Sequence, residues 1–161
     1  MKSFKDTAGR QWNISVTIGA AKRIKDTLGV DLLRLDKPSE DDKLPLLTRL
    51  GVDELLLAEI ICCLIGEKQF AEHNVTEDDI RDSFDGSTML AAQTAFYEEL
   101  IDFFQQRGRD YLATAIEKQL ATIDAAAKQA ETILEKLDPQ TLINGKTFGE
   151  SPDSLASIPD R

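Results

Sequence analysis

The stretch Asp53-Glu-Leu-Leu-Leu-Ala-Glu-Ile-Ile-Cys-Cys-Leu-Ile-Gly66 contains the longest apolar run of the chain, from Leu55 to Ile65. Asp53 is a favourable N-cap, and Gly66 is a common residue at a helix end. Because the run between them is apolar on nearly every side, we predict a central, buried helix here. The run is interrupted by Glu59 and is much shorter than the roughly 20 residues of a membrane span, so no membrane helix is expected.

From Leu44 onward, through the long helix expected at Arg109–Leu137, the chain is predicted to be wholly helical. The sequence Thr76-Glu-Asp-Asp79 has the form of a capping box, which opens a short helix ending near Gly86. Ser87 is expected to cap a longer helix that ends at Gly108. One apolar stripe should run along that longer helix through Leu90, Ala91, Thr94, Tyr97, Leu100, Ile101 and Phe104.

Upstream, the sequence has the two-residue period of a β-strand. Apolar and polar residues alternate from Trp12 to Ile18, after a turn that contains Gly9. This predicts an N-terminal β-hairpin with one apolar face, which must pack on another element because a lone hairpin is marginal in water. The following residues, Ile18 to Leu28, have helical spacing and end at Gly29.

The segment Arg109–Leu137 is predicted to form one long helix. At 1.5 Å per residue it would be about 43 Å long, which exceeds the width of a domain of this size. Part of it either extends to meet another chain or folds back across the domain as an ordinary core helix. Its apolar residues follow a heptad pattern, and these seven are the candidate partner-binding residues: Ile116, Leu120, Ile123, Ala127, Ala130, Leu134 and Leu137.

These patterns define the expected organisation. The fold class is mainly α, with an N-terminal β-hairpin packed on a small helical domain. The hairpin and helical domain should occupy residues 1–112, the extended helix with its heptad seam residues 113–137, and a flexible tail residues 138–161. The tail contains three of the five prolines and no periodic apolar pattern.

The chain of 161 residues carries a formal net charge of −10. This charge disfavours nucleic acid or an anionic membrane as the main partner. Residues 1–35 have the opposite charge balance, with seven Lys or Arg against three Asp or Glu. We interpret these basic side chains as a solvated face. No apolar stretch of the signal-peptide type opens the sequence, which favours the cytoplasm.

Residue types that carry enzyme chemistry are sparse. Cys62 and Cys63 are adjacent in a predicted helix, where they cannot readily pair, and are expected to be small buried side chains. His73 is the only histidine and is expected in an exposed loop, so no two-histidine metal site can form. The Gly145-Lys-Thr147 sequence lacks the glycine five residues earlier that a phosphate loop needs. We therefore expect a protein that is not an enzyme, with no catalytic residue, metal or cofactor.

Several stretches, taken in order and spacing, resemble a known group of proteins over roughly residues 2–115. They are Phe4-x-Asp6-x-Ala8-Gly9-Arg10-x-Trp12-x-Ile14, Ala21-x-Arg23-Ile24-Lys25, Leu28-Gly29-Val30-Asp31-Leu32-Leu33, Val75-Thr76-Glu77-Asp78-Asp79 and Phe96-Tyr97-Glu98-Glu99-Leu100-Ile101-Asp102-Phe103-Phe104. The group is the small tail-assembly proteins of tailed bacteriophages and prophages.

The resemblance implies a tail assembly chaperone, a non-enzymatic protein that coats the tape-measure protein, recruits tail-tube subunits and leaves before the virion is complete. It would act in the bacterial host cytoplasm, and it could form a homo-oligomer. Two alternatives remain open at this stage. One is a structural or accessory tail or connector component that stays in the particle. The other is an acidic cytoplasmic adaptor that shields a basic partner.

Overall fold

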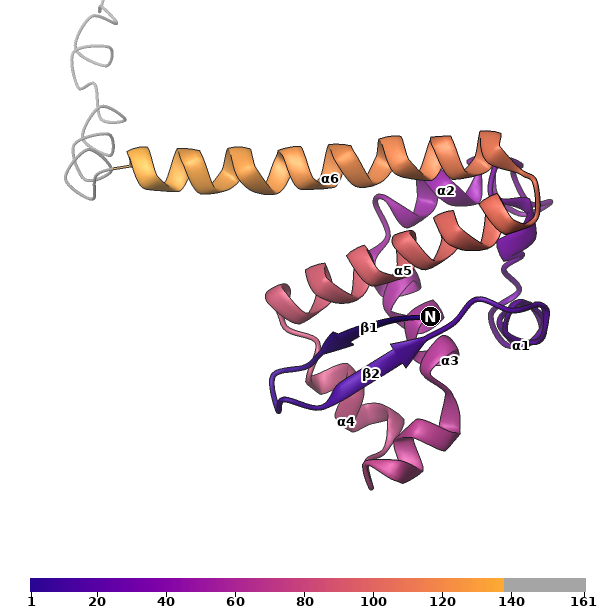
Figure 1. Ribbon diagram of the computed structural model, residues 1–161, viewed down its shortest axis with the longest axis horizontal. Coiled ribbons are helices and arrows are strands. Elements are labelled where there is room, and N and C mark those ends of the chain that lie inside the picture. The colour runs from indigo at the N-terminus through magenta and orange to yellow at the C-terminus, as the bar shows by residue number, and fades with distance from the viewer. Residues whose placement is uncertain (138–161) are drawn as a thin grey trace, which may run out of the picture. The chain divides into compact units, whose positions relative to one another are not determined.

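The computed structural model describes residues 1–137, so the predicted flexible tail, 138–161, lies outside the described residues. The predicted mainly α fold with an N-terminal hairpin is confirmed (Figure 1). In chain order the elements are β1 (Lys2–Lys5), β2 (Gln11–Ile14), α1 (Ile18–Leu28), the 3-10 turn η1 (Leu32–Arg34), α2 (Leu46–Leu50), α3 (Glu54–Glu72), α4 (Glu77–Asp82), α5 (Gly86–Gln106) and α6 (Asp110–Lys136). The chain divides into two compact units, Met1–Ala121 and Thr122–Arg161, so the boundary falls inside α6.

The first unit has its core between the hairpin, α1, α3 and α5. β1 lies along α5 in Figure 1, while β2 and α1 pack on α3. The core is completed by the first turns of α6 through Leu112, Ala113 and Ile116. The largest side chains that are fully buried include Trp12, Ile24, Ile60, Ile61, Phe96, Tyr97 and Phe104. The run Leu55–Ile65 therefore contributes to the core, as predicted, but only one side of α3 is buried.

The hairpin is antiparallel, with Phe4 paired to Trp12, and its turn is organised by Asp6. The buried carboxylate of Asp6 accepts hydrogen bonds from the backbone N–H of Arg10 at 3.0 Å and from Trp12 Nε1 at 2.9 Å. It also pairs with Arg10 Nε at 2.7 Å. Burial opposes ionisation of Asp6, but these hydrogen bonds outweigh it and hold the pKa of the carboxyl below its ordinary value.

Three features of the helices differ from the sequence prediction. The short helix expected to end near Gly86 ends at Asp82, as α4. Helix α3 breaks at Gly66, as predicted, since this residue adopts the non-helical φ +77°, ψ 159°. The residues after it, predicted as a polar stretch, are helical again, so α3 consists of two helical segments joined by a kink at Gly66. The helix expected to be capped by Ser87 begins two residues earlier, at Gly86 instead of Thr88. Asp85 is its N-cap, since the Asp85 side chain accepts from the backbone N–H of Thr88 at 2.8 Å.

Other local predictions are confirmed. Gly29 caps α1 in the left-handed conformation, and Thr76 and Asp79 form the capping box of α4. The stripe predicted on α5 is right only in part, because its first residues, Leu90 and Ala91, are exposed. The buried face instead runs through Thr88, Ala92, Ala95, Phe96, Tyr97, Glu99, Leu100, Ile101 and Phe104.

Candidate functional site

The two cysteine thiols are poor candidates for reactive groups. Cys62 is buried and Cys63 is half-buried, and neither is in a disulfide. Burial raises the pKa of the Cys62 thiol to about 12 and also raises the pKa of Cys63. Because the thiolate is the nucleophile and the metal ligand, both groups stay in their inert form near neutral pH. Among residues 1–137 there is also no group of three His, Cys, Asp or Glu placed to hold a metal ion.

His73 is exposed, as predicted, but it has a packing role at the end of α3. Its ring lies 4.6 Å from the ring of Trp12, centroid to centroid, in an edge-on arrangement. The guanidinium of Arg10 lies over the same indole at 5.7 Å. The Trp12 indole therefore makes an aromatic contact with His73 at the end of α3 and a cation–π contact with Arg10 of the hairpin.

The first half of α6 is anchored in the first unit. Ile116 is 0% exposed and belongs to the core, so it does not lie on an open surface. Gln119 donates hydrogen bonds to the backbone carbonyl of Leu47 at 2.9 Å and to the hydroxyl oxygen of Tyr97 at 2.8 Å. These contacts fix the helix as far as Leu120, which is half-buried.

The rest of the predicted seam becomes more exposed toward the end of α6. Ile123 and Ala127 are half-buried, while Ala130, Leu134 and Leu137 are exposed, Leu134 to 68%. The neighbouring Ile133 is 59% exposed. Large aliphatic side chains at heptad spacing are normally covered by a partner helix. We call the set Ile123, Ala127, Ala130, Leu134 and Leu137 the α6 stripe, and it is the candidate functional surface.

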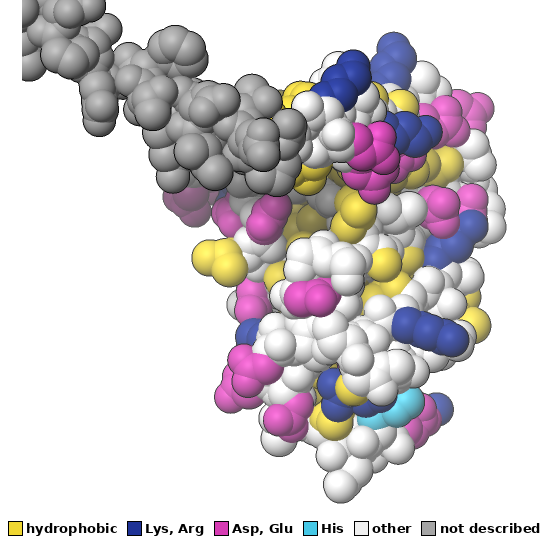
Figure 2. Space-filling model, turned by 90° about the vertical axis from the view of Figure 1, so that its left-hand side faces the viewer, with side chains coloured by type: hydrophobic (Ala, Val, Ile, Leu, Met, Phe, Trp, Pro, Cys, Tyr) yellow, Lys and Arg dark blue, Asp and Glu magenta, His cyan; other side chains and the backbone are white. Residues whose placement is uncertain are grey.

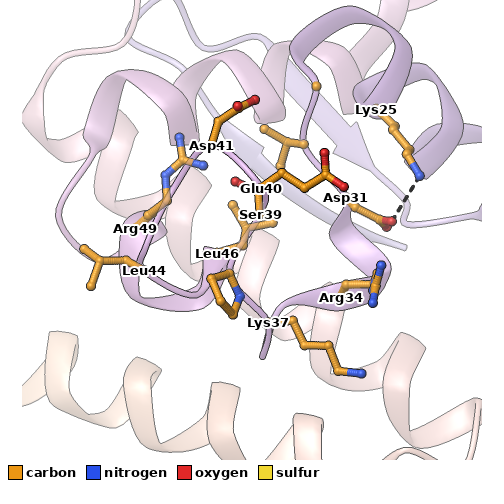
Figure 3. A pocket seen from close by; sticks show the side chains of 13 residues that line it. Lys25, Asp31, Arg34, Lys37, Ser39, Glu40, Asp41, Leu44, Leu46 and Arg49 are labelled. Carbon is orange, nitrogen blue, oxygen red and sulfur yellow. Dashed lines mark hydrogen bonds and ion pairs between the residues drawn. The ribbon is translucent and has the colours of Figure 1, made fainter.

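A hollow of about 340 Å³ lies between the end of α1 and the segment that leads into α2. In Figure 3, Lys25, Arg34 and Lys37 lie on one side of it and Arg49 on the other, with Ser39 and Glu40 between them. Lys25 pairs with Asp31 at 3.3 Å, and Arg49 pairs with Asp42 at 2.7 Å. Because basic and acidic side chains alternate around it, the hollow has no charge preference that would define a ligand.

No protein-family model, curated protein or solved structure matches this chain. Among the described helices, none is long and apolar enough to cross a bilayer. On the face drawn in Figure 2, hydrophobic side chains reach the surface in separate patches among acidic and basic ones. The α6 stripe, which the heptad spacing of the sequence predicts as a partner-binding surface, remains the candidate functional surface among the described residues.

Proposed function

We propose that this protein is a non-enzymatic tail assembly chaperone of a tailed bacteriophage or prophage. It binds the helices of the tape-measure protein and recruits tail-tube subunits in the host cytoplasm. The observation that carries the proposal is the α6 stripe, which presents apolar side chains at heptad spacing with Leu134 exposed to 68%.

The energetics of the stripe support a binding role. Fully burying one exposed aliphatic side chain is worth about 1.5–3 kcal/mol, so the largest gain comes from covering Leu134. Ile123 and Leu137 add less, because they are already partly covered. A helix laid along another helix at heptad spacing buries these side chains together. The same geometry would suit a second copy of this chain, so self-association through the α6 stripe competes with client binding.

The charge of the chain supports the same role. The client that the resemblance implies is a long, helical protein, whose apolar helical faces would need to be covered. A coat of chaperone molecules with a formal charge of −10 each makes such complexes repel one another and keeps them dispersed.

Co-expression with the tape-measure protein from the same phage genome tests the proposal. We expect the tape-measure protein to appear in the soluble fraction with this protein and in the pellet without it. Equal distribution in both cases would contradict the chaperone role. Recovery of the chain from purified mature particles would instead favour a structural component of the tail, because a chaperone leaves before completion.

A further inference from the structure

A second surface, unrelated to the α6 stripe, lies on the first unit where α3 begins and where α4 leads into α5. These elements enclose a hollow of about 260 Å³. The apolar side chains of Leu55, Ala58, Phe84 and Met89 line it. We call this hollow the α3–α5 groove. Its volume lies below the range of about 300–1,000 Å³ typical of small-molecule sites, so it suits a side chain better than a metabolite.

Leu55 is the most exposed large apolar residue in the described chain, at 81%. The opposite side of α3 enters the core through Leu57, Ile60 and Ile61. Leu55 therefore gains nothing from the core of its own unit. Val52, just before the helix, is also 76% exposed. An apolar wall left open beside a hollow is the usual form of a docking site for a partner's side chain.

The charges around the groove are strongly one-sided. Arg81 is its only basic lining residue among those described, and its guanidinium is fully engaged. It pairs with Glu59 through two hydrogen bonds of 2.7 and 2.9 Å, with Glu77 at 2.9 Å and with Asp78 at 3.0 Å. The hydrogen bonds from Arg81 lower the pKa of Glu59 and keep it ionised.

Two further carboxylates stand at the groove, Glu54 at the start of α3 and Asp85 at the N-cap of α5. Asp85 accepts hydrogen bonds from Thr88 and Ser87, which lower its pKa and leave its negative charge at the surface. Three carboxylates, those of Glu54, Glu59 and Asp85, thus line the groove against the single guanidinium of Arg81, whose charge is also shared with Glu77 and Asp78. The field around the groove is negative, and it repels nucleic acid and anionic lipid.

We propose that the α3–α5 groove binds a basic amphipathic helix of a partner protein. One Leu-, Met- or Phe-sized side chain of that helix packs against Leu55, Phe84 and Met89. Lysine or arginine residues one turn to either side pair with Glu54 and Asp85. The apolar anchor supplies most of the affinity, while the charges set the orientation and the association rate.

The test uses a labelled synthetic helix of 14 residues, with Leu at positions 4, 7, 8 and 11 and Lys and Ala elsewhere, titrated into the full chain. We expect Leu55→Ala to weaken binding about tenfold, the loss of roughly one apolar contact. The matched control is Ile18→Ala, which truncates another exposed aliphatic residue and should leave binding unchanged. Equal affinity of both variants would overturn the proposal.

The charge component is tested with Glu54→Gln combined with Asp85→Asn, since asparagine preserves the helix cap. We expect binding at low salt to weaken about three- to tenfold, and the difference to shrink at 0.5 M salt. The control, Glu40→Gln with Asp41→Asn, removes the same charge elsewhere and should have a smaller effect. Equal effects of the two pairs, or equal binding of a helix with Glu in place of Lys, would contradict a basic partner.

Discussion

The buried carboxylate of Glu99 on α5 accepts a 3.0 Å hydrogen bond from the backbone N–H of Val16, 83 residues earlier in the sequence. Its other oxygen lies 3.0 Å from the ammonium group of Met1. Glu99 is only 5% exposed, whereas its neighbour Glu98 is exposed. One acidic side chain therefore ties the hairpin and its exit into α1 to the longest buried helix of the first unit.

Glu99→Ala should lower the free energy of unfolding by about 2–3 kcal/mol, because it leaves the buried N–H of Val16 without an acceptor. Glu99→Gln keeps an acceptor oxygen and should cost less. Urea denaturation measures both. Glu98→Ala is the control and should change stability by no more than about 0.5 kcal/mol. Equal stabilities of the alanine variants at 98 and 99 would show that the hydrogen bond contributes nothing.

Asp6 should make stability depend on pH. Its pKa is lowered in the folded chain, so its contribution is complete above the ordinary aspartate value of about 3.9 and is lost as the pH falls through the folded value. Asp6→Asn should cost about 1–3 kcal/mol at pH 7. Urea denaturation should show that the difference in the free energy of unfolding between wild type and Asp6→Asn becomes smaller below about pH 4. The control is the exposed Asp26→Asn, which should change the free energy of unfolding at pH 7 by no more than about 0.5 kcal/mol.

Cys62 should be unreactive in the native protein. With a pKa of about 12, roughly one thiol in ten thousand is ionised at pH 8. Iodoacetamide labelling followed by mass spectrometry should modify Cys63 first and Cys62 only in denaturant. The single-thiol variants Cys62→Ser and Cys63→Ser separate the two rates. Fast native labelling of Cys62 would contradict its burial.

Gly66→Ala should destabilise the protein by about 1–3 kcal/mol, because φ +77°, ψ 159° is a conformation that only glycine adopts readily. No neighbouring atom lies within 4 Å of the added Cβ, so the cost is conformational and not steric. Gly86→Ala is the matched control, since its Cβ also meets open space and its φ is not positive. The free energy of unfolding of both variants is measured by urea denaturation. Equal values for Gly66→Ala and Gly86→Ala would rule out backbone strain at position 66.

The sequence is most informative where the signal is local. The two-residue period before Ile18, the Thr76–Asp79 box and the glycine at 29 each specify a structure through neighbouring residues alone, and each is confirmed. Gly66 correctly indicates a break in the helix, but its identity gives no sign that the helix resumes beyond it.

Features that depend on contacts between residues far apart in the chain could not be predicted from the sequence. The sequence of Glu98 and Glu99 does not show which of the two carboxylates is buried. Glu99 is buried because the backbone N–H of Val16 needs a hydrogen-bond acceptor. The heptad spacing identified the α6 stripe, but not that Ile116 belongs to the core. The α3–α5 groove could not be predicted from the sequence, because nothing in the apolar run Leu55–Ile65 indicates that Leu55 is exposed.

The central claim is that this protein acts through the α6 stripe, and a pair of matched variants tests it most directly. Ile123→Glu with Leu134→Glu places two charges on the stripe, while Ala125→Glu with Gln129→Glu places two charges on the opposite face of the same helix. The measurement is the soluble fraction of co-expressed tape-measure protein. We expect the stripe variant to leave the tape-measure protein in the pellet and the opposite-face variant to keep it soluble as the wild type does. Equal solubility with both variants would contradict the claim.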